Sequence, residues 1–175
     1  MTLDLQALKP AYDVVINKAS IYHFWSLDKE GALFFDQPYQ RPYEWEEKEQ
    51  QAFLNSLLAG HDIGKIAMSA HETDPHLQNV VDGKQRLTTA LLFFYGKLPF
   101  VHQGKEWFFN NPSHFALPDQ RELKKRPLSL AELSYRSGKG VALKDQIDYF
   151  YRVNYTGKPL SQEHFNKVMA LIAEH

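Results

Sequence analysis

A segment with phosphate-binding chemistry lies near the middle of the chain. It runs Asp82-Gly83-Lys84-Gln85-Arg86 between the apolar pair Val80-Val81 and a stretch that opens Leu87-Thr88-Thr89. A tight turn from a strand into a helix leaves the first backbone N–H groups of the helix without partners, and these donors favour an anion. Gly83 permits a close backbone approach, and Arg86 presents a planar fork of donors that suits phosphate oxygens. The spacing therefore predicts a phosphate site.

The remaining side chains of this segment extend that chemistry. Thr88 and Thr89 add hydroxyl donors, and Asp82, at the end of the strand, has the carboxylate needed to hold Mg²⁺ or to orient a hydroxyl nucleophile. The same Asp-Gly pair before a helix is also typical of an ordinary turn. Both interpretations fit the spacing taken alone.

A second segment places an arginine among prolines and aromatic residues. It reads Tyr39-Gln40-Arg41-Pro42-Tyr43-Glu44-Trp45. An arginine held this way loses little conformational entropy when it binds phosphate, and it can stack on aromatic rings. The alternative is a loop whose aromatic residues fill the core while Arg41 pairs with one of the glutamates that follow.

The elements that must position these residues are indicated by hydrophobic spacing and by turn residues. Residues 36–45 read as a structured loop because of their two prolines. Helices are predicted over residues 20–30, 46–59, 87–95 and 143–153, with two more beginning at Ser129 and Ser161, and strands over residues 32–35, 63–68, 77–81 and 106–109. Ser129 with Glu132 has the spacing of a capping box, which is why a helix is predicted there.

The C-terminal third of the chain is basic. Residues 1–120 carry a net charge of −5 and residues 121–175 a net charge of +4, within a total of −1. Lys124, Lys125, Arg126 and Lys139 are therefore candidates for contacts with DNA phosphates. The alternative is a solvated surface with mixed charges.

Composition excludes several classes of protein. The 175 residues are 43% hydrophobic and 23% charged, which is typical of a globular domain. The chain has no cysteine, so disulfide scaffolds, thiol catalysis and iron–sulfur clusters are excluded. No apolar stretch approaches the ~18 residues of a membrane span, and the N-terminus lacks the pattern of a secretion signal. We expect a cytoplasmic protein with no membrane partner, in the bacterial host cytoplasm if a phage encodes it.

The order of these motifs carries a family resemblance. Tyr39-Gln40-Arg41-Pro42-Tyr43-Glu44-Trp45, the acidic helix after it, the pair Ile63-Gly64, and the run from Val80 to Thr89 follow one another. This arrangement, over residues 16–96, resembles the N-terminal domain of GmrSD-type restriction endonucleases, within the ParB/sulfiredoxin-like superfamily. The resemblance implies a compact α+β nucleotide-binding fold. We expect a single domain over residues 1–175, with a small mixed sheet, helices packed around it and a mainly helical extension over residues 97–175.

The family's Asp-Gly-Gln-Gln-Arg motif binds or hydrolyses a nucleoside triphosphate, which the resemblance carries to matching positions here. They are Tyr39, Gln40, Arg41, Asp82, Gly83, Gln85 and Arg86, with Ile63-Gly64 marking a strand that lines the same pocket. We expect Asp82, Gln85 and Arg86 to be catalytic. Nucleotide contacts are expected from Tyr39, Gln40, Arg41, Gly64, Gly83, Lys84, Thr88 and Thr89, with Mg²⁺ held through Asp82.

The chain departs from the family pattern at two positions and in its extent. Lys84 stands where the family most often has glutamine, and Gln37 where it usually has proline. The family's large restriction enzymes carry a C-terminal His-Asn-His nuclease domain, which we do not expect here. Five of the eight histidines, His71, His76, His102, His114 and His164, have no convincing metal-ligand spacing.

These observations lead to three functional hypotheses. The first is an ATP- or NTP-dependent phosphotransferase or NTPase in DNA modification or defence, most sharply a DNA kinase that phosphorylates a hydroxymethylated pyrimidine in phage DNA. This step rests on analogy with superfamily members that transfer phosphoryl groups. The second is a non-catalytic nucleotide sensor or anti-restriction module. The third is a nuclease or nuclease-related subunit. Neither the base of the nucleotide nor the oligomeric state can be predicted from these motifs.

Overall fold

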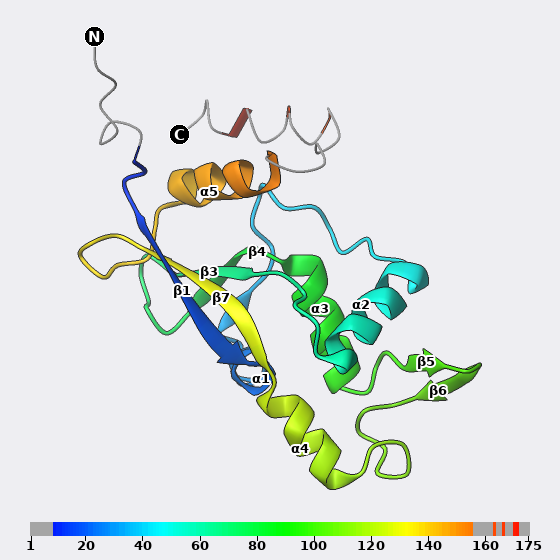
Figure 1. The fold of residues 1–175 in the computed structure, drawn as a ribbon. Helices are drawn as coiled ribbons and strands as arrows, with labels where there is room; N and C mark the ends of the chain where they lie inside the picture. The colour runs from blue at the N-terminus through cyan, green and yellow to red at the C-terminus, as the bar shows by residue number, and fades with distance from the viewer. Residues whose placement is uncertain (1–8, 156–162, 164–165, 167–169, 172–175) are drawn as a thin grey trace.

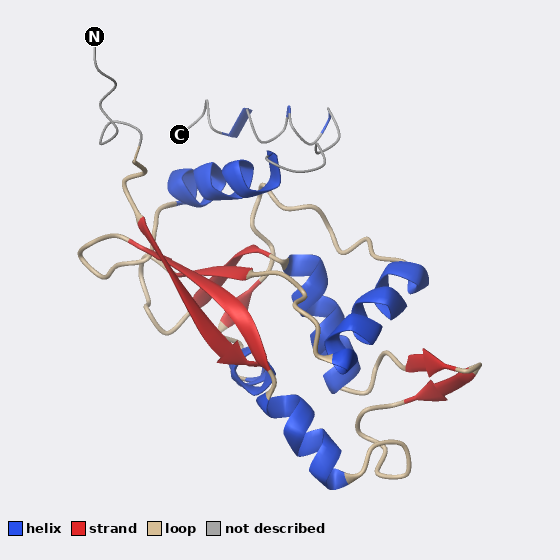
Figure 2. Cartoon of the chain, in the orientation of Figure 1, coloured by secondary structure: helices blue, strands red, loops and turns tan. Residues whose placement is uncertain are grey.

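The computed structural model describes residues 9–155, 163, 166, 170 and 171 (Figure 1). Helices and strands are mixed along the chain (Figure 2). Their order is β1 (Asp13–Ser20), α1 (Ile21–Lys29), β2 (Leu33–Phe34), α2 (Glu47–Ala59), β3 (Ile66–Ala70), β4 (Gln78–Asp82), α3 (Lys84–Phe94), β5 (Phe100–His102), β6 (Lys105–Trp107), α4 (Leu117–Lys125), β7 (Pro127–Ser134) and α5 (Leu143–Tyr155).

The central sheet has five strands in the order β1-β7-β3-β4-β2. β1 pairs antiparallel with β7, β7 parallel with β3, β3 antiparallel with β4, and β4 parallel with β2. β5 and β6 form a separate antiparallel hairpin. The mixed sheet with its surrounding helices confirms the predicted α+β class, while the likeness to ParB and sulfiredoxin remains a prediction.

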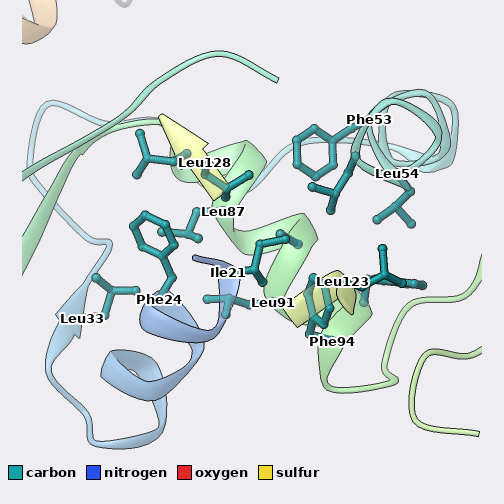
Figure 3. Close-up of a cluster of buried hydrophobic side chains, with 14 of the residues drawn as sticks. Ile21, Phe24, Leu33, Phe53, Leu54, Leu87, Leu91, Phe94, Leu123 and Leu128 are labelled. Atoms are coloured by element: carbon teal, nitrogen blue, oxygen red, sulfur yellow. The ribbon is translucent and has the colours of Figure 1, made fainter. Parts of the chain in front are cut away.

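Both faces of the sheet are covered by apolar side chains. On one face α1, α2 and α3 bury residues such as Phe24, Leu54 and Leu87 (Figure 3). On the other face α5 packs Ile147 and Phe150 against the sheet, and α5 lies across the sheet from α3 in Figure 1. Each fully buried side chain of this size contributes about 1.5–3 kcal/mol. The two layers hold in place the end of β4, where the chain turns into α3.

The helix predicted to begin at Ser129 is wrong, because residues 127–134 form the strand β7. Leu128 and Leu130 point into the core shared with α1–α3, whereas Ala131 and Leu133 point into the core under α5. This alternation is the period of a strand buried on both faces. β7 also lies between β1 and β3, so part of the expected helical extension is a central strand of the sheet.

The other predicted elements match the structure with shifted ends. The first two helices are confirmed; Ser20 caps α1 through a hydrogen bond to the His23 N–H, and Gly60 ends α2 in a left-handed conformation. The strand predicted from residue 63 begins at Ile66, so Ile63-Gly64 precedes β3 rather than lying in it. β1, α4 and β5 were not predicted, and the helix predicted from Ser161 falls largely outside the described residues.

Candidate functional site

A pocket of about 210 Å³ lies where β4 turns into α3. Its walls come from the loop after β2, the start of α3 and the last turns of α5. The lining residues are Gln40, Arg41, Trp45, Asp82, Gly83, Lys84, Gln85, Arg86, Phe150 and Asn154. Seven of the predicted site residues are thus brought together in this pocket, which we call the α3 pocket.

Gly83 makes the abrupt turn from strand to helix possible. It is the N-cap residue of α3 with φ of 92°, a left-handed conformation that favours glycine. A Cβ atom here would lie 2.7 Å from Cδ1 of Ile66, so space also requires glycine. α3 starts at Lys84, three residues earlier than predicted. Because no side chain caps the helix, its first N–H groups are available to an anion.

Asp82 and Arg86 form an ion pair inside the pocket. Arg86 Nη2 lies 2.9 Å from Asp82 Oδ2, and Arg86 Nη1 donates to the carbonyl of Ile63 at 3.3 Å. Asn154 Nδ2 donates to the other carboxylate oxygen of Asp82 at 3.3 Å. The two side chains of the ion pair are only 15% and 25% exposed, so the carboxylate and the guanidinium are held in fixed positions.

Gly64 makes room for Arg86. Its φ is 83°, and a Cβ atom at this position would overlap Arg86 Nη1. The resemblance placed Gly64 in a pocket-lining strand, but it lies in the loop before β3, where the missing side chain leaves space for the guanidinium.

Gln40 is anchored beneath the pocket by its amide group. Nε2 donates to the carbonyls of Val80 at 2.6 Å and of Val81 at 2.9 Å. The side chain is 93% buried, and within the described residues its Oε1 has no hydrogen-bond partner. A buried acceptor without a partner is costly, so Gln40 supplies an unused acceptor in the wall.

Tyr39 lies deeper than expected for a ligand contact. It is fully buried, and its hydroxyl donates to Gln146 Oε1 at 3.2 Å. Burial first, and then the negative charge of Asp82, raise the pKa of Tyr39 well above its ordinary value. The phenol therefore stays protonated at neutral pH and supports the pocket from below.

Gln85 holds the loop of the second motif against α3. Its Oε1 accepts the backbone N–H groups of Glu44 at 2.9 Å and Trp45 at 3.2 Å, and its Nε2 donates to the Pro42 carbonyl at 2.7 Å. Because both ends of the amide are engaged, the structure gives Gln85 the geometry of a positioning residue, although we expected it among the catalytic groups.

The two other cations at the pocket are each paired with an exposed acid. Lys84 Nζ lies 2.9 Å from Asp36 Oδ1, and Arg41 Nη1 lies 3.3 Å from Glu44 Oε2. The Lys84 side chain is 13% exposed, whereas that of Asp36 is 96% exposed. The pair of Arg41 with Glu44 is exposed on both sides, and exposed ion pairs are worth little in water.

The remaining predicted residues lie outside the α3 pocket. Thr89 is buried and donates to the Gln85 carbonyl, and Thr88 lines a different cavity. Arg126 binds the carbonyls of Leu57 and Leu58 at the end of α2, Lys124 and Lys125 lie in the last turn of α4, and Lys139 lies between β7 and α5. None of these four cations lines the α3 pocket, and the DNA contacts expected of them stay a prediction.

Sequence reasoning missed three residues that line the pocket. Trp45 was noticed only as part of its loop, whereas Phe150 and Asn154 come from α5, far away in the sequence. These two are four residues apart and so share one face of the helix, which was the only available signal.

Clusters of metal-ligating side chains and membrane-spanning helices are both absent from the described residues. No group of three or more His, Cys, Asp or Glu side chains there could hold a metal ion, and none of those residues forms a helix long and apolar enough to span a membrane.

Comparison with known proteins agrees with the motif order. The family model for the GmrSD restriction endonuclease, N-terminal domain, matches residues 21–170. Searches of curated proteins and of solved structures found no match. The family match covers most of the chain and includes every residue of the α3 pocket. The chain therefore belongs to the GmrSD restriction endonuclease N-terminal domain family, with a role in restriction and defence.

Proposed function

We propose that the α3 pocket binds the phosphates of a nucleoside triphosphate and directs transfer of its terminal phosphoryl group to a hydroxyl of DNA. The observation that carries the proposal is the uncapped start of α3, which opens into a pocket lined by Asp82, Lys84 and Arg86. Helix N–H groups beside lysine and arginine are a recurrent phosphate-binding arrangement. Membership of a restriction family supports DNA as the partner.

The size and charge of the pocket suit phosphates rather than a whole nucleotide. It is lined by three cationic side chains, those of Arg41, Lys84 and Arg86, and by one carboxylate, that of Asp82. Its volume of about 210 Å³ is below the ~300–1,000 Å³ typical of pockets that enclose a whole ligand. The sugar and base therefore lie outside this pocket, and its lining residues contribute little to base preference.

The residues present fit a magnesium ion shared with the nucleotide. Mg²⁺ is usually bound by one or two carboxylates together with substrate phosphates, and the pocket offers Asp82, with the amide of Asn154 beside it. When bound, the ion would neutralise charge on the phosphate oxygens. Asp82 would hold it, which requires the carboxylate to loosen its pairing with Arg86.

The chain's own residues act by position and charge. Arg86 uses two of its five N–H donors on Asp82 and Ile63, so three remain for phosphoryl oxygens. In the transfer, the acceptor hydroxyl oxygen forms a bond to the terminal phosphorus while the bond from that phosphorus to the bridging oxygen breaks. The hydroxyl proton passes to water, and the nucleoside diphosphate leaves. The Arg86 guanidinium and the α3 N–H groups stabilise the charge on the phosphoryl group during this step.

The sharpest form of the proposal takes the hydroxyl of a hydroxymethylated pyrimidine as the acceptor. The test is incubation of the purified protein with ATP labelled at its terminal phosphate, Mg²⁺, and either plain or hydroxymethylated DNA of the same sequence. We expect label on the hydroxymethylated DNA alone. Label released only as free phosphate would restrict the activity to an NTPase. Shortened DNA would indicate a nuclease, and no reaction despite nucleotide binding would indicate a sensor module.

A further inference from the structure

We propose that a second cavity, at the opposite end of α2 from the α3 pocket, takes up a single nucleobase extruded from a DNA strand. This cavity of about 470 Å³ is open to solvent and is lined by residues of the β5–β6 hairpin, the turn after it, α4 and the end of α2. The hairpin and α4 lie in the lower part of Figure 1. It is lined by Leu58, Phe100, His102, Trp107, His114, Phe115, Asp119, Glu122, Leu123 and Arg126, and we call it the aromatic pocket.

The aromatic pocket is separate from the α3 pocket. Trp45, just before α2, lines the α3 pocket, whereas Leu58, near the end of α2, lines the aromatic pocket. The 13 residues of this helix span about 20 Å. The two pockets share no lining residue, and this proposal does not rest on the phosphotransferase function.

The walls suit a flat, uncharged ring. Phe100, Trp107 and Phe115 supply aromatic surfaces, and Leu58 and Leu123 supply aliphatic ones. The His102 ring stacks on Phe100 with centroids 5.9 Å apart and an interplanar angle of 17°. Stacking on aromatic side chains is the general way in which proteins hold unpaired bases, because every base has a π-face. The volume falls within the range of pockets that enclose a small ligand.

Hydrogen-bond donors and hydrogen-bond acceptors interrupt these apolar walls. His114 Nδ1 accepts the backbone N–H of Phe108 at 3.0 Å, so the neutral ring carries its proton on Nε2 and can donate there. Trp107 also has a buried indole N–H that lacks a hydrogen-bond partner in the described part of the chain. Asp119 and Glu122, three residues apart on α4, supply carboxylate acceptors. The Watson–Crick edge of a nucleobase carries donors and acceptors side by side and so matches this set.

The charges around the aromatic pocket separate a base from its phosphates. Asp119 and Glu122 line it and repel a phosphate group, and Arg126, which also lines it, is held by the carbonyls of Leu57 and Leu58. Arg121 and Lys125 follow on the same helix as exposed residues outside the lining. A strand that lays its phosphates along these cations can turn one base inward. Extrusion of a base costs least when the strand is already single, so single-stranded DNA is the favoured ligand.

The test measures how much of the affinity for a short single-stranded oligonucleotide depends on one base. Fluorescence anisotropy with the whole protein, without ATP or Mg²⁺, compares an intact oligonucleotide with one that carries a central abasic site. We expect the intact strand to bind ~10-fold more tightly, which is within the range for one stacked base. Asp119→Ala with Glu122→Ala, which removes both acceptors, should reduce this ratio, whereas Glu106→Ala, the same change at an exposed residue outside the pocket lining, should not.

The outcomes distinguish this proposal from ordinary electrostatic binding. Asp119 and Glu122 are exposed, so their neutral variants are expected to fold. Equal dissociation constants for intact and abasic strands would overturn the proposal, because binding would then involve phosphates only. A ratio that the double variant leaves unchanged would also overturn it by placing the base elsewhere. Neither result bears on phosphoryl transfer, which the ATP assay measures separately.

Discussion

Gly64→Ala tests whether the space left by a glycine is what holds Arg86 against Asp82. Gly64 has φ of 83°, so alanine pays the cost of the left-handed conformation, roughly 1–2 kcal/mol. Its Cβ would also overlap Arg86 Nη1 and lie 3.5 Å from Cζ, so the guanidinium must move. Gly31→Ala is the matched control, since Gly31 has φ of 68° and nothing within 4 Å of the Cβ position.

The two variants should share the backbone cost and differ in the side-chain cost. In urea unfolding we expect Gly31→Ala to lose about 1–2 kcal/mol and Gly64→Ala to lose more, because displacing Arg86 adds the loss of a partly buried ion pair. Removing the Arg86 side chain, with which the new Cβ would overlap, should reduce the loss in free energy of unfolding caused by Gly64→Ala. Once Arg86→Ala is present, adding Gly64→Ala should cost only about as much as Gly31→Ala does in the natural chain.

Turnover of ATP should separate the variants further. Gly64→Ala should lower the rate by ~100-fold or more, because one preorganised donor is lost from the phosphoryl group, while Gly31→Ala should leave it unchanged. Equal stability of the two glycine variants, or strictly additive effects of Gly64→Ala and Arg86→Ala, would refute the packing argument. Normal turnover by a folded Gly64→Ala protein would refute the role given to the displaced guanidinium.

Three further predictions address other charges. Asp82→Asn should lower kcat far more than it weakens ATP binding, since a carboxylate that holds Mg²⁺ matters most as charge develops; calorimetric binding beside steady-state rates checks this, and the reverse pattern would contradict it. Replacing Lys124 and Lys125 with alanine should make the slope of log affinity for DNA against log salt shallower by about 1.5, measured by anisotropy, and an unaltered slope would show that neither side chain contacts phosphate. Burial, and then the hydrogen bond to Asp28, raise the pKa of Tyr95 to about 12, so the folded chain holds this proton more tightly than the unfolded chain does. The resulting stability is present below pH ~10 and is lost as the pH rises toward 12, and Tyr95→Phe should reduce that alkaline loss in urea unfolding at pH 8 and pH 11.

The turn from β4 into α3 could be predicted because its signals are local, although the helix begins three residues earlier than expected. Gly83 after a strand marks the turn, and the side chains that follow it are fixed by the geometry of one helical turn. The strand β7 could not be predicted in the same way. Ser129 and Glu132 have capping-box spacing, but pairing with β1 and β3 and burial on both faces decide the outcome, and these partners are distant in sequence.

The partners of the site residues also depend on contacts that local sequence does not indicate. Nothing in the motif distinguishes Gln85, which holds the loop, from Arg86, which lines the pocket beside the carboxylate, because both follow the same turn. Asn154 reaches Asp82 from α5 across 72 residues of sequence, and no local pattern indicates such a contact. Residue types and short spacings thus indicated which side chains gather at the turn, and tertiary contacts decide which partner each side chain has.

The rate at which Arg86→Ala turns over the terminal phosphoryl group of ATP tests most directly whether the α3 pocket is the site of phosphoryl transfer. The control is Arg136→Ala, which removes an arginine that is exposed on the surface and lies outside the α3 pocket. We predict that Arg86→Ala retains the far-ultraviolet circular dichroism of the natural chain but loses ~100- to 1,000-fold in rate, while Arg136→Ala keeps full activity. A folded Arg86→Ala protein with a rate near that of the natural chain would contradict the assignment of the α3 pocket as the site of phosphoryl transfer.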